Sequence, residues 1–93
     1  MFEHFTIKYN SKISSAYLEA VGISAGEIEQ LFYLDYHVVH VGTRDYFIIG
    51  FTGLRMLIVD FELNYEENLI KVEEIYIPNG EDIKEKYCRH CFK

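Results

Sequence analysis

The hydrophobic pattern of the chain changes its period near Tyr36, and this change constrains the fold more than any other feature. Before that position, apolar residues recur at the three- and four-residue spacing of amphipathic helices. After it, four segments rich in β-branched and aromatic residues are separated by short turn-forming sequences. Connections this short join hairpins rather than crossover helices, so the second half of the chain predicts antiparallel strands.

A first strand precedes the helical part. Polar and apolar side chains alternate over residues 2–9. The inward side of this strand would carry Phe5, Ile7 and Tyr9. The next segment takes helical spacing and predicts a helix with Asn10 or Ser11 as its N-cap and Gly22 as its C-terminal stop.

A second helix is predicted by Ser24, which is followed three residues later by Glu27. This is the capping-box spacing, in which each of the two side chains bonds the backbone N–H of the other residue. Ile23, directly before the cap, would act as a hydrophobic staple. The inward stripe would be Ile28, Leu31 and Phe32. Because almost nothing separates the two helices, they should form a tight corner.

The stretch MLIVDF, residues 56–61, is nearly continuous in its apolar character, which predicts a strand in mid-sheet with both faces covered. At 93 residues and 49% hydrophobic, the chain suits a single domain over residues 1–93. The predicted fold is α+β, with two N-terminal helices packed on an antiparallel sheet of about four strands. After the turn-forming residues 78–80, residues 81–93 predict a short C-terminal helix. The predicted core includes Phe32, Leu57, Val59, Phe61 and Ile75.

The charge of the chain is unfavourable for nucleic acid. Fifteen acidic and nine basic side chains give a formal net charge of −6. Such a chain repels a polyanion on average, so RNA binding would require a local basic site. No stretch reaches the roughly 18 to 20 apolar residues that span a bilayer, and the N-terminus lacks the pattern of a signal peptide. We therefore expect a cytoplasmic protein without a membrane partner.

The two cysteines of the chain, Cys88 and Cys91, lie three residues apart near its end. A structural zinc site normally has four ligands, so His4, His37 or His40 would have to complete it, and the sequence leaves open whether the fold allows this. A redox pair is usually found at the start of a helix, whereas this pair follows a predicted helix. We expect two ordinary thiols, and neither a metal nor a redox site.

Asp60 is unusual because a carboxylate within an apolar strand must find a partner or stay protonated. It is a candidate catalytic acid or base, or else a structural carboxylate at a sheet edge or opposite a basic residue. Glu73 and Glu74 are adjacent on the last predicted strand and should point to opposite sides. The chain has no glycine-rich phosphate loop, nucleophile elbow or dinucleotide fingerprint, so no cofactor is predicted.

The order of elements and two short motifs resemble a known family. A Gly-Ile-Ser corner spans residues 22–24 and precedes an acidic helix residue. A Gly-x-Thr turn begins at Gly50 and precedes Arg55 and the apolar strand. In these features the chain looks like the small BrnT-like toxins of bacterial toxin–antitoxin pairs, which are similar in fold to the RelE-type ribonucleases.

The resemblance implies a metal-independent endoribonuclease that an antitoxin holds inactive. Such toxins position the 2′-hydroxyl of RNA with a base and stabilise the scissile phosphate with arginine or lysine. Arg55 and Lys71 would then bind phosphate, and Tyr76 or Tyr87 would stack a base or donate a proton. Lys71 and Tyr76 stand at or near positions where the family carries arginines, and two adjacent glutamates lie between them.

A second hypothesis is a non-catalytic protein-binding module, either a degenerate toxin scaffold or a mimic of an acidic surface. In that case the tyrosines are packing residues and Arg55 pairs with a nearby carboxylate. The ribonuclease hypothesis instead requires its site residues on one side of the sheet. The expected strand register favours an Arg55–Tyr76 site, because Lys71 should lie nearer the middle of the preceding strand.

Overall fold

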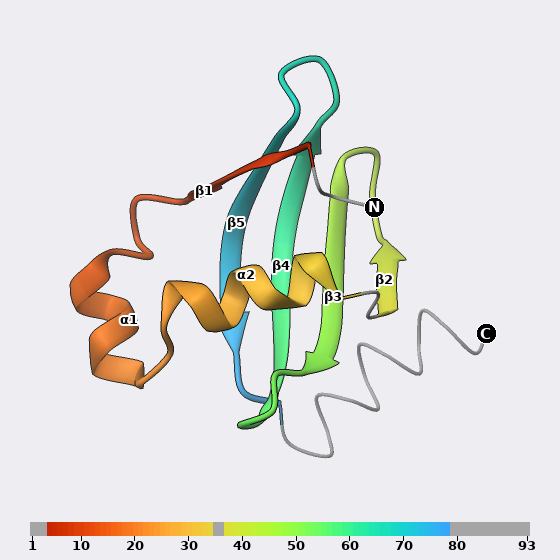
Figure 1. Cartoon of the computed structure of the whole chain (residues 1–93). Coiled ribbons are helices and arrows are strands. Elements are labelled where there is room, and N and C mark those ends of the chain that lie inside the picture. Colours follow the sequence, from red (N-terminus) through yellow and green to blue (C-terminus); the bar gives the residue numbers. More distant parts are fainter. Residues whose placement is uncertain (1–3, 35–36, 79–93) are drawn as a thin grey trace.

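The computed structural model describes residues 4–34 and 37–78, which form two helices and five strands (Figure 1). In chain order the elements are β1 (Thr6–Tyr9), α1 (Ser15–Val21), α2 (Ala25–Tyr33), β2 (His37–His40), β3 (Asp45–Phe51), β4 (Met56–Asn64) and β5 (Leu69–Tyr76). The change of period at Tyr36 therefore separates the helices from the strand meander, and the α+β class is confirmed.

The five strands form one sheet in the order β1-β5-β4-β3-β2. Strands β2 to β5 are an antiparallel meander, as the short turns predicted. Strand β1 instead runs parallel to β5, where Thr6 pairs with Leu69 and Tyr9 pairs with Val72. The prediction of a wholly antiparallel sheet of about four strands is thus corrected to a five-stranded mixed sheet.

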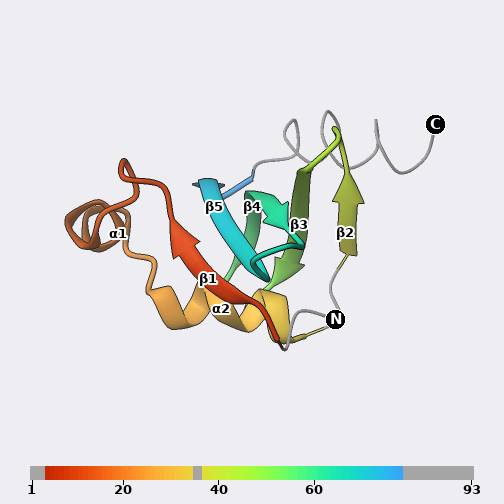
Figure 2. The same ribbon diagram turned by 90° about the horizontal axis from the view of Figure 1, so that it is seen from above.

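The path of the helices explains the parallel pair. From the end of β1, the helices carry the chain across one face of the sheet toward its far edge, where β2 begins (Figures 1 and 2). The meander then returns strand by strand, so β5 arrives beside β1 and runs in the same direction. Pairing with β1 satisfies backbone groups that β5 would otherwise leave open at the sheet edge.

The main core lies between α2 and the sheet. The predicted inward stripe of this helix is confirmed, because Ile28, Leu31 and Phe32 are at most 2% exposed. The ring of Phe32 meets that of Phe61 edge to face, with 5.0 Å between the centroids. The five predicted core residues are all buried. From β1, Phe5, Ile7 and Tyr9 pack partly buried against the same cluster.

Helix α1 begins later than predicted. Its N-cap is Ser14, whose Oγ accepts the backbone N–H of the residue three positions on, at 3.1 Å. The prediction of Asn10 or Ser11 as the N-cap is wrong, because Asn10 closes a local turn by accepting the backbone N–H of Lys12. The predicted stop at Gly22 is confirmed, since its φ of 75° is the left-handed conformation that favours glycine.

The other face of the sheet carries a second apolar cluster. Its buried members are Val39, Phe47, Ile49 and Ile58, with Met56 and Tyr76 packed partly buried against them. Strand β4 lies in the middle of the sheet, and its Leu57, Ile58 and Val59 are each 0% exposed. The segment MLIVDF is therefore buried on both faces, as its composition predicted.

The predicted C-terminal helix over residues 81–93 lies outside the described residues, and so do Tyr87, Cys88 and Cys91. Within the described part of the chain, neither helix has the length and apolar character that a bilayer crossing requires.

Candidate functional site

Arg55, the first predicted site residue, stands directly before β4 and is held by the helical layer. Its Nε lies 3.0 Å from Oε2 of Glu27, and its side chain is 29% exposed. The N–H of this nitrogen does not point at the oxygen, so the contact is an ion pair rather than a directed hydrogen bond. One terminal nitrogen also donates to the backbone oxygen of Gly22 at 3.0 Å. Arg55 thus ties the corner between the helices to the start of β4.

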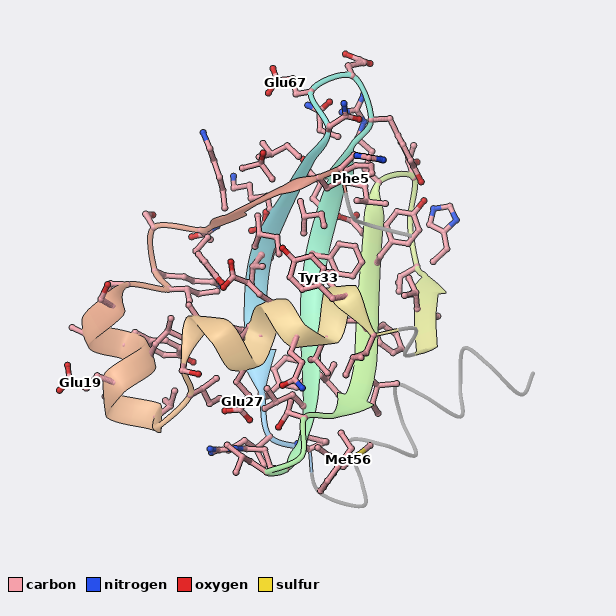
Figure 3. The ribbon with its side chains drawn as sticks, in the orientation of Figure 1. Phe5, Glu19, Glu27, Tyr33, Met56 and Glu67 are labelled. Atoms are coloured by element: carbon pink, nitrogen blue, oxygen red, sulfur yellow. The ribbon has the colours of Figure 1, made fainter. Side chains whose placement is uncertain are left out.

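Glu27 is a buried carboxylate with 4% of its side chain exposed. It accepts a hydrogen bond of 2.8 Å from the hydroxyl of Thr52, in the turn between β3 and β4. Figure 3 shows Glu27 pointing from the start of α2 toward this end of the sheet. Ser24 accepts the backbone N–H of Glu27 at 3.1 Å, which confirms the cap. The carboxylate itself turns to Thr52 and Arg55, so only the serine half of the predicted capping box is seen.

Tyr76 lies on the opposite face of the sheet from Arg55. It is the last residue of β5, pairs in register with Ile58 and packs against the second apolar cluster. Its hydroxyl donates to Oδ2 of Asp60 at 2.7 Å. Asp60 is thus a half-buried residue of central strand β4, not of a sheet edge. The structure therefore does not bring Arg55 and Tyr76 together, and their catalytic role stays a prediction.

Lys71 lies five residues before Tyr76 on β5, roughly 16 to 17 Å away along a strand. Its Nζ is 3.9 Å from Glu73, and 48% of its side chain is exposed. Across the sheet it pairs with Glu62 of β4 on one side and with Lys8 of β1 on the other. Two lysines thus stand side by side on neighbouring strands. The sequence could not reveal this pair, because it depends on the parallel pairing of β1.

A bulge in β5 shapes the surface near Tyr76. Asp60 pairs with Glu74, and the next residue of β4 pairs with Val72, so Glu73 is an extra residue in the ladder. The bulge lets both glutamates reach the loop after β1: Glu73 accepts a hydrogen bond of 2.8 Å from Asn10, and Glu74 lies 3.2 Å from the Nζ of Lys12. The expectation that strict alternation sends the two carboxylates to opposite sides is corrected accordingly.

Two pockets share these glutamates. The first, of about 240 Å³, is lined by Val41, Asp45, Tyr46, Phe47, Asp60, Phe61, Glu73 and Glu74. The second, of about 390 Å³, is lined by Lys12, Ile13, Tyr17, Glu73, Glu74, Ile75 and Tyr76. Four residues with carboxylates border the first pocket, and none of the described residues that line it is basic. We call this first cavity the acidic pocket.

Aromatic rings gather at the end of the sheet where β3 begins. His40 stacks on Tyr46 with 4.5 Å between the ring centroids, and the hydroxyls of Tyr46 and Tyr65 are 3.3 Å apart. Tyr65 also meets Phe5 edge to face at 6.0 Å. The hydrogen bond with Tyr65, more than burial, raises the pKa of Tyr46. Sequence reasoning missed this group, whose only signal was the 16% aromatic content.

The described arginines already face carboxylates. Arg55 pairs with Glu27, and Arg44 lies 3.4 Å from Glu66. Among the described lysines, Lys8 is the one that makes no ion pair within 4.0 Å with another described residue. Most of the described basic side chains are therefore already paired with carboxylates, and acidic side chains predominate on the surface.

No group of three or more residues with metal-binding side chains comes together within the described ranges. The cysteine pair and its part in any metal site lie outside them. Comparison of the chain with protein-family models, with curated proteins and with solved structures finds no match.

Proposed function

We propose that this protein is a non-catalytic binding module that takes a basic segment of a protein partner. The observation that carries this proposal is the acidic pocket, where Asp45, Asp60, Glu73 and Glu74 border one cavity and no described residue of its lining is basic. A lysine or arginine side chain entering it would pass an apolar wall that includes Phe47 and would set its charge among carboxylates.

The surrounding surface favours the same class of partner. A net charge of −6 attracts a basic segment over a distance of about 10 Å at moderate salt and speeds its arrival. The same charge repels the phosphates of nucleic acid. Arg55 and Tyr76, which the ribonuclease hypothesis needs, are engaged with Glu27 and Asp60 on opposite faces.

The test is a titration with a flexible, lysine-rich peptide and with a matched peptide that carries glutamate at the same positions. We expect the lysine peptide alone to bind, and the affinity to fall as salt rises. Asp45→Asn should weaken binding, because Asp45 lines the pocket and makes no ion pair within 4.0 Å with another described residue. Glu19→Gln is the matched control, since it removes one charge from α1, a helix that contributes no residue to the lining of the acidic pocket. Equal effects of the two variants would contradict the pocket.

A second candidate function is an RNA-directed toxin of the BrnT or RelE type, controlled by an antitoxin. The pairing of Lys8 with Lys71 favours it, because two neighbouring cations on adjacent strands could hold a phosphate. A cleavage assay on single-stranded RNA would compare the wild type with Lys71→Ala, Arg55→Ala and Tyr76→Phe. Cleavage that is lost in Lys71→Ala would support this function, and absence of cleavage by the wild type would remove it.

A further inference from the structure

The ring group at the start of β3 forms a connected surface, which we call the aromatic surface: Phe5, His40, Tyr46 and Tyr65. Its members come from four separate parts of the chain, the segment before β1, strands β2 and β3, and the turn after β4. Tyr65 is 66% exposed, so ring area faces solvent. Aromatic residues gathered in this way are typical of the contact surfaces of proteins.

The aromatic surface is anchored in the core. Tyr46 stacks on buried Phe61 with 5.6 Å between the centroids and 15° between the ring planes. Phe61 in turn packs against Phe32 of α2. Rings held in this way lose little conformational freedom when a ligand binds, which lowers the entropic cost of binding.

A guanidinium group already pairs with a carboxylate that follows one of these rings in the chain. Arg44 of the β2–β3 turn is 3.4 Å from Glu66, the residue after Tyr65, and the two side chains are 50% and 80% exposed. Exposed pairs of this kind contribute between zero and about 1 kcal/mol, so a second guanidinium could replace Arg44 at small cost. Glu67 follows directly and projects from the same turn (Figure 3).

We propose that the aromatic surface, with Glu66 and Glu67 at its rim, binds arginine side chains of a basic partner segment. This inference rests on the proposed function and names the side chain that the partner must present. Arginine fits because its planar guanidinium stacks on a ring while its N–H groups reach a carboxylate. Lysine, a compact and strongly hydrated charge, gains less from such a surface.

The negative charge of Glu66 and Glu67 disfavours two other ligands of the aromatic surface, RNA and a second copy of the chain. RNA could stack its bases on the rings, but its phosphates would meet Glu66 and Glu67. A second copy of the chain would bring another net charge of −6 against this rim. The acidic pocket borders the aromatic surface, since Tyr46 is part of the lining of the one and of the rings of the other. The side chains of Asp45 and Tyr46 point to opposite faces of the sheet, because the two are consecutive residues of β3. The carboxylates of the pocket and the exposed rings therefore offer different groups to a partner.

The test uses two flexible peptides that differ only in carrying arginine or lysine at the same positions. Binding to the full chain would be followed through the aromatic NMR signals at matched peptide concentrations. We expect the arginine peptide to bind more tightly and to shift the rings of Tyr46 and Tyr65. Tyr65→Ala should weaken the arginine peptide about 2- to 5-fold and leave the lysine peptide nearly unchanged. Leu54→Ala is the control, an exposed side chain in the turn at the other end of the sheet.

The outcomes separate the two proposals. Loss of the preference for arginine in Tyr65→Ala supports the aromatic surface. If Tyr65→Ala weakens both peptides equally, or weakens neither, the aromatic surface is overturned. The proposed function still stands in that case if Asp45→Asn weakens the binding of both peptides. Failure of both peptides to bind overturns both proposals. Ring shifts caused by single-stranded RNA, and not by the arginine peptide, would overturn the aromatic surface as a protein-binding site.

Discussion

Two arginine–glutamate pairs lie at opposite ends of the same sheet, and they differ in almost every physical respect. Arg55 and Glu27 are 3.0 Å apart and 29% and 4% exposed. Arg44 and Glu66 are 3.4 Å apart and 50% and 80% exposed. The first pair is enclosed and joins the helices to the sheet, whereas the second is open to solvent and salt. The same residue chemistry thus joins the helices to the sheet at one end and is open to solvent at the other.

The largest effect that the comparison predicts is that of Glu27→Ala. The substitution leaves Arg55 partly buried without its carboxylate and removes the acceptor of the Thr52 hydroxyl. We expect the free energy of unfolding to fall by about 2 to 4 kcal/mol, measured by urea denaturation. Glu19→Ala, on the exposed surface of α1, should change it little. Similar losses in both variants would mean that the enclosed pair has no special role.

Ser24→Ala probes the same end of the sheet through the backbone. Ser24 accepts the N–H of Glu27 at 3.1 Å, and alanine offers no such acceptor. The expected loss is about 1 kcal/mol in the free energy of unfolding, visible as a lower melting temperature. Ser15→Ala, one residue past the N-cap of α1, is a matched control that removes no cap. An unchanged melting temperature in Ser24→Ala would contradict the importance of this cap.

Tyr9 differs from these paired groups, because its hydroxyl is buried with no hydrogen-bond partner among the described residues. Burial, with a smaller contribution from Glu29, raises the pKa of Tyr9 from 10.0 to about 12. The unfolded chain therefore loses this proton first, and the stability due to the neutral phenol, full below about pH 10, declines as pH rises toward 12.

The variant Tyr9→Phe should remove this part of the pH dependence and leave stability near neutral pH unchanged or slightly higher. The measurement is the free energy of unfolding of both proteins at about pH 9 and about pH 11. Only the difference between them reports on Tyr9, because other tyrosines ionise in the same range. An identical decline in the two proteins would show that Tyr9 ionises alike in the folded and unfolded chain.

Arg44→Ala should have the smallest effect. Its pair with Glu66 is long and exposed, so we expect a change in the free energy of unfolding below about 0.5 kcal/mol. Urea denaturation at low and high salt would check this value. A loss approaching that of Glu27→Ala would remove the contrast between the two pairs and show that the open end also holds the fold together.

The local parts of the fold could be predicted from the sequence because each depends on neighbouring residues. The cap at Ser24, the stop at Gly22 and the hairpin turns were all read from short motifs. The parallel pairing of β1 with β5 was missed because it joins distant segments and has no local signal. The late start of α1 was missed because Asn10 can close a turn as well as cap a helix.

The candidate site was less predictable for the same reason. Arg55 is predicted to bind phosphate, and the alternative prediction pairs it with a nearby carboxylate; its ion pair with Glu27 agrees with the alternative, although the sequence assigns Glu27 to a capping box. The side of the sheet on which Tyr76 lies depends on the pairing register and on the bulge at Glu73, neither of which composition reveals. The aromatic surface draws its members from four segments and exists only in the folded chain.

The pairing of the first strand with the last also has a consequence during synthesis. The segment Thr6–Tyr9 leaves the ribosome well before its hydrogen-bonding partner, Leu69–Val72. Until then the meander lacks its final strand, and β1 has no neighbour in the sheet. Closure of this long-range contact is entropically costly, so we expect it to be a late step in folding. The sheet is completed only after β5 has emerged, and a ribosome-bound chain that stops before β5 exposes an unpaired strand.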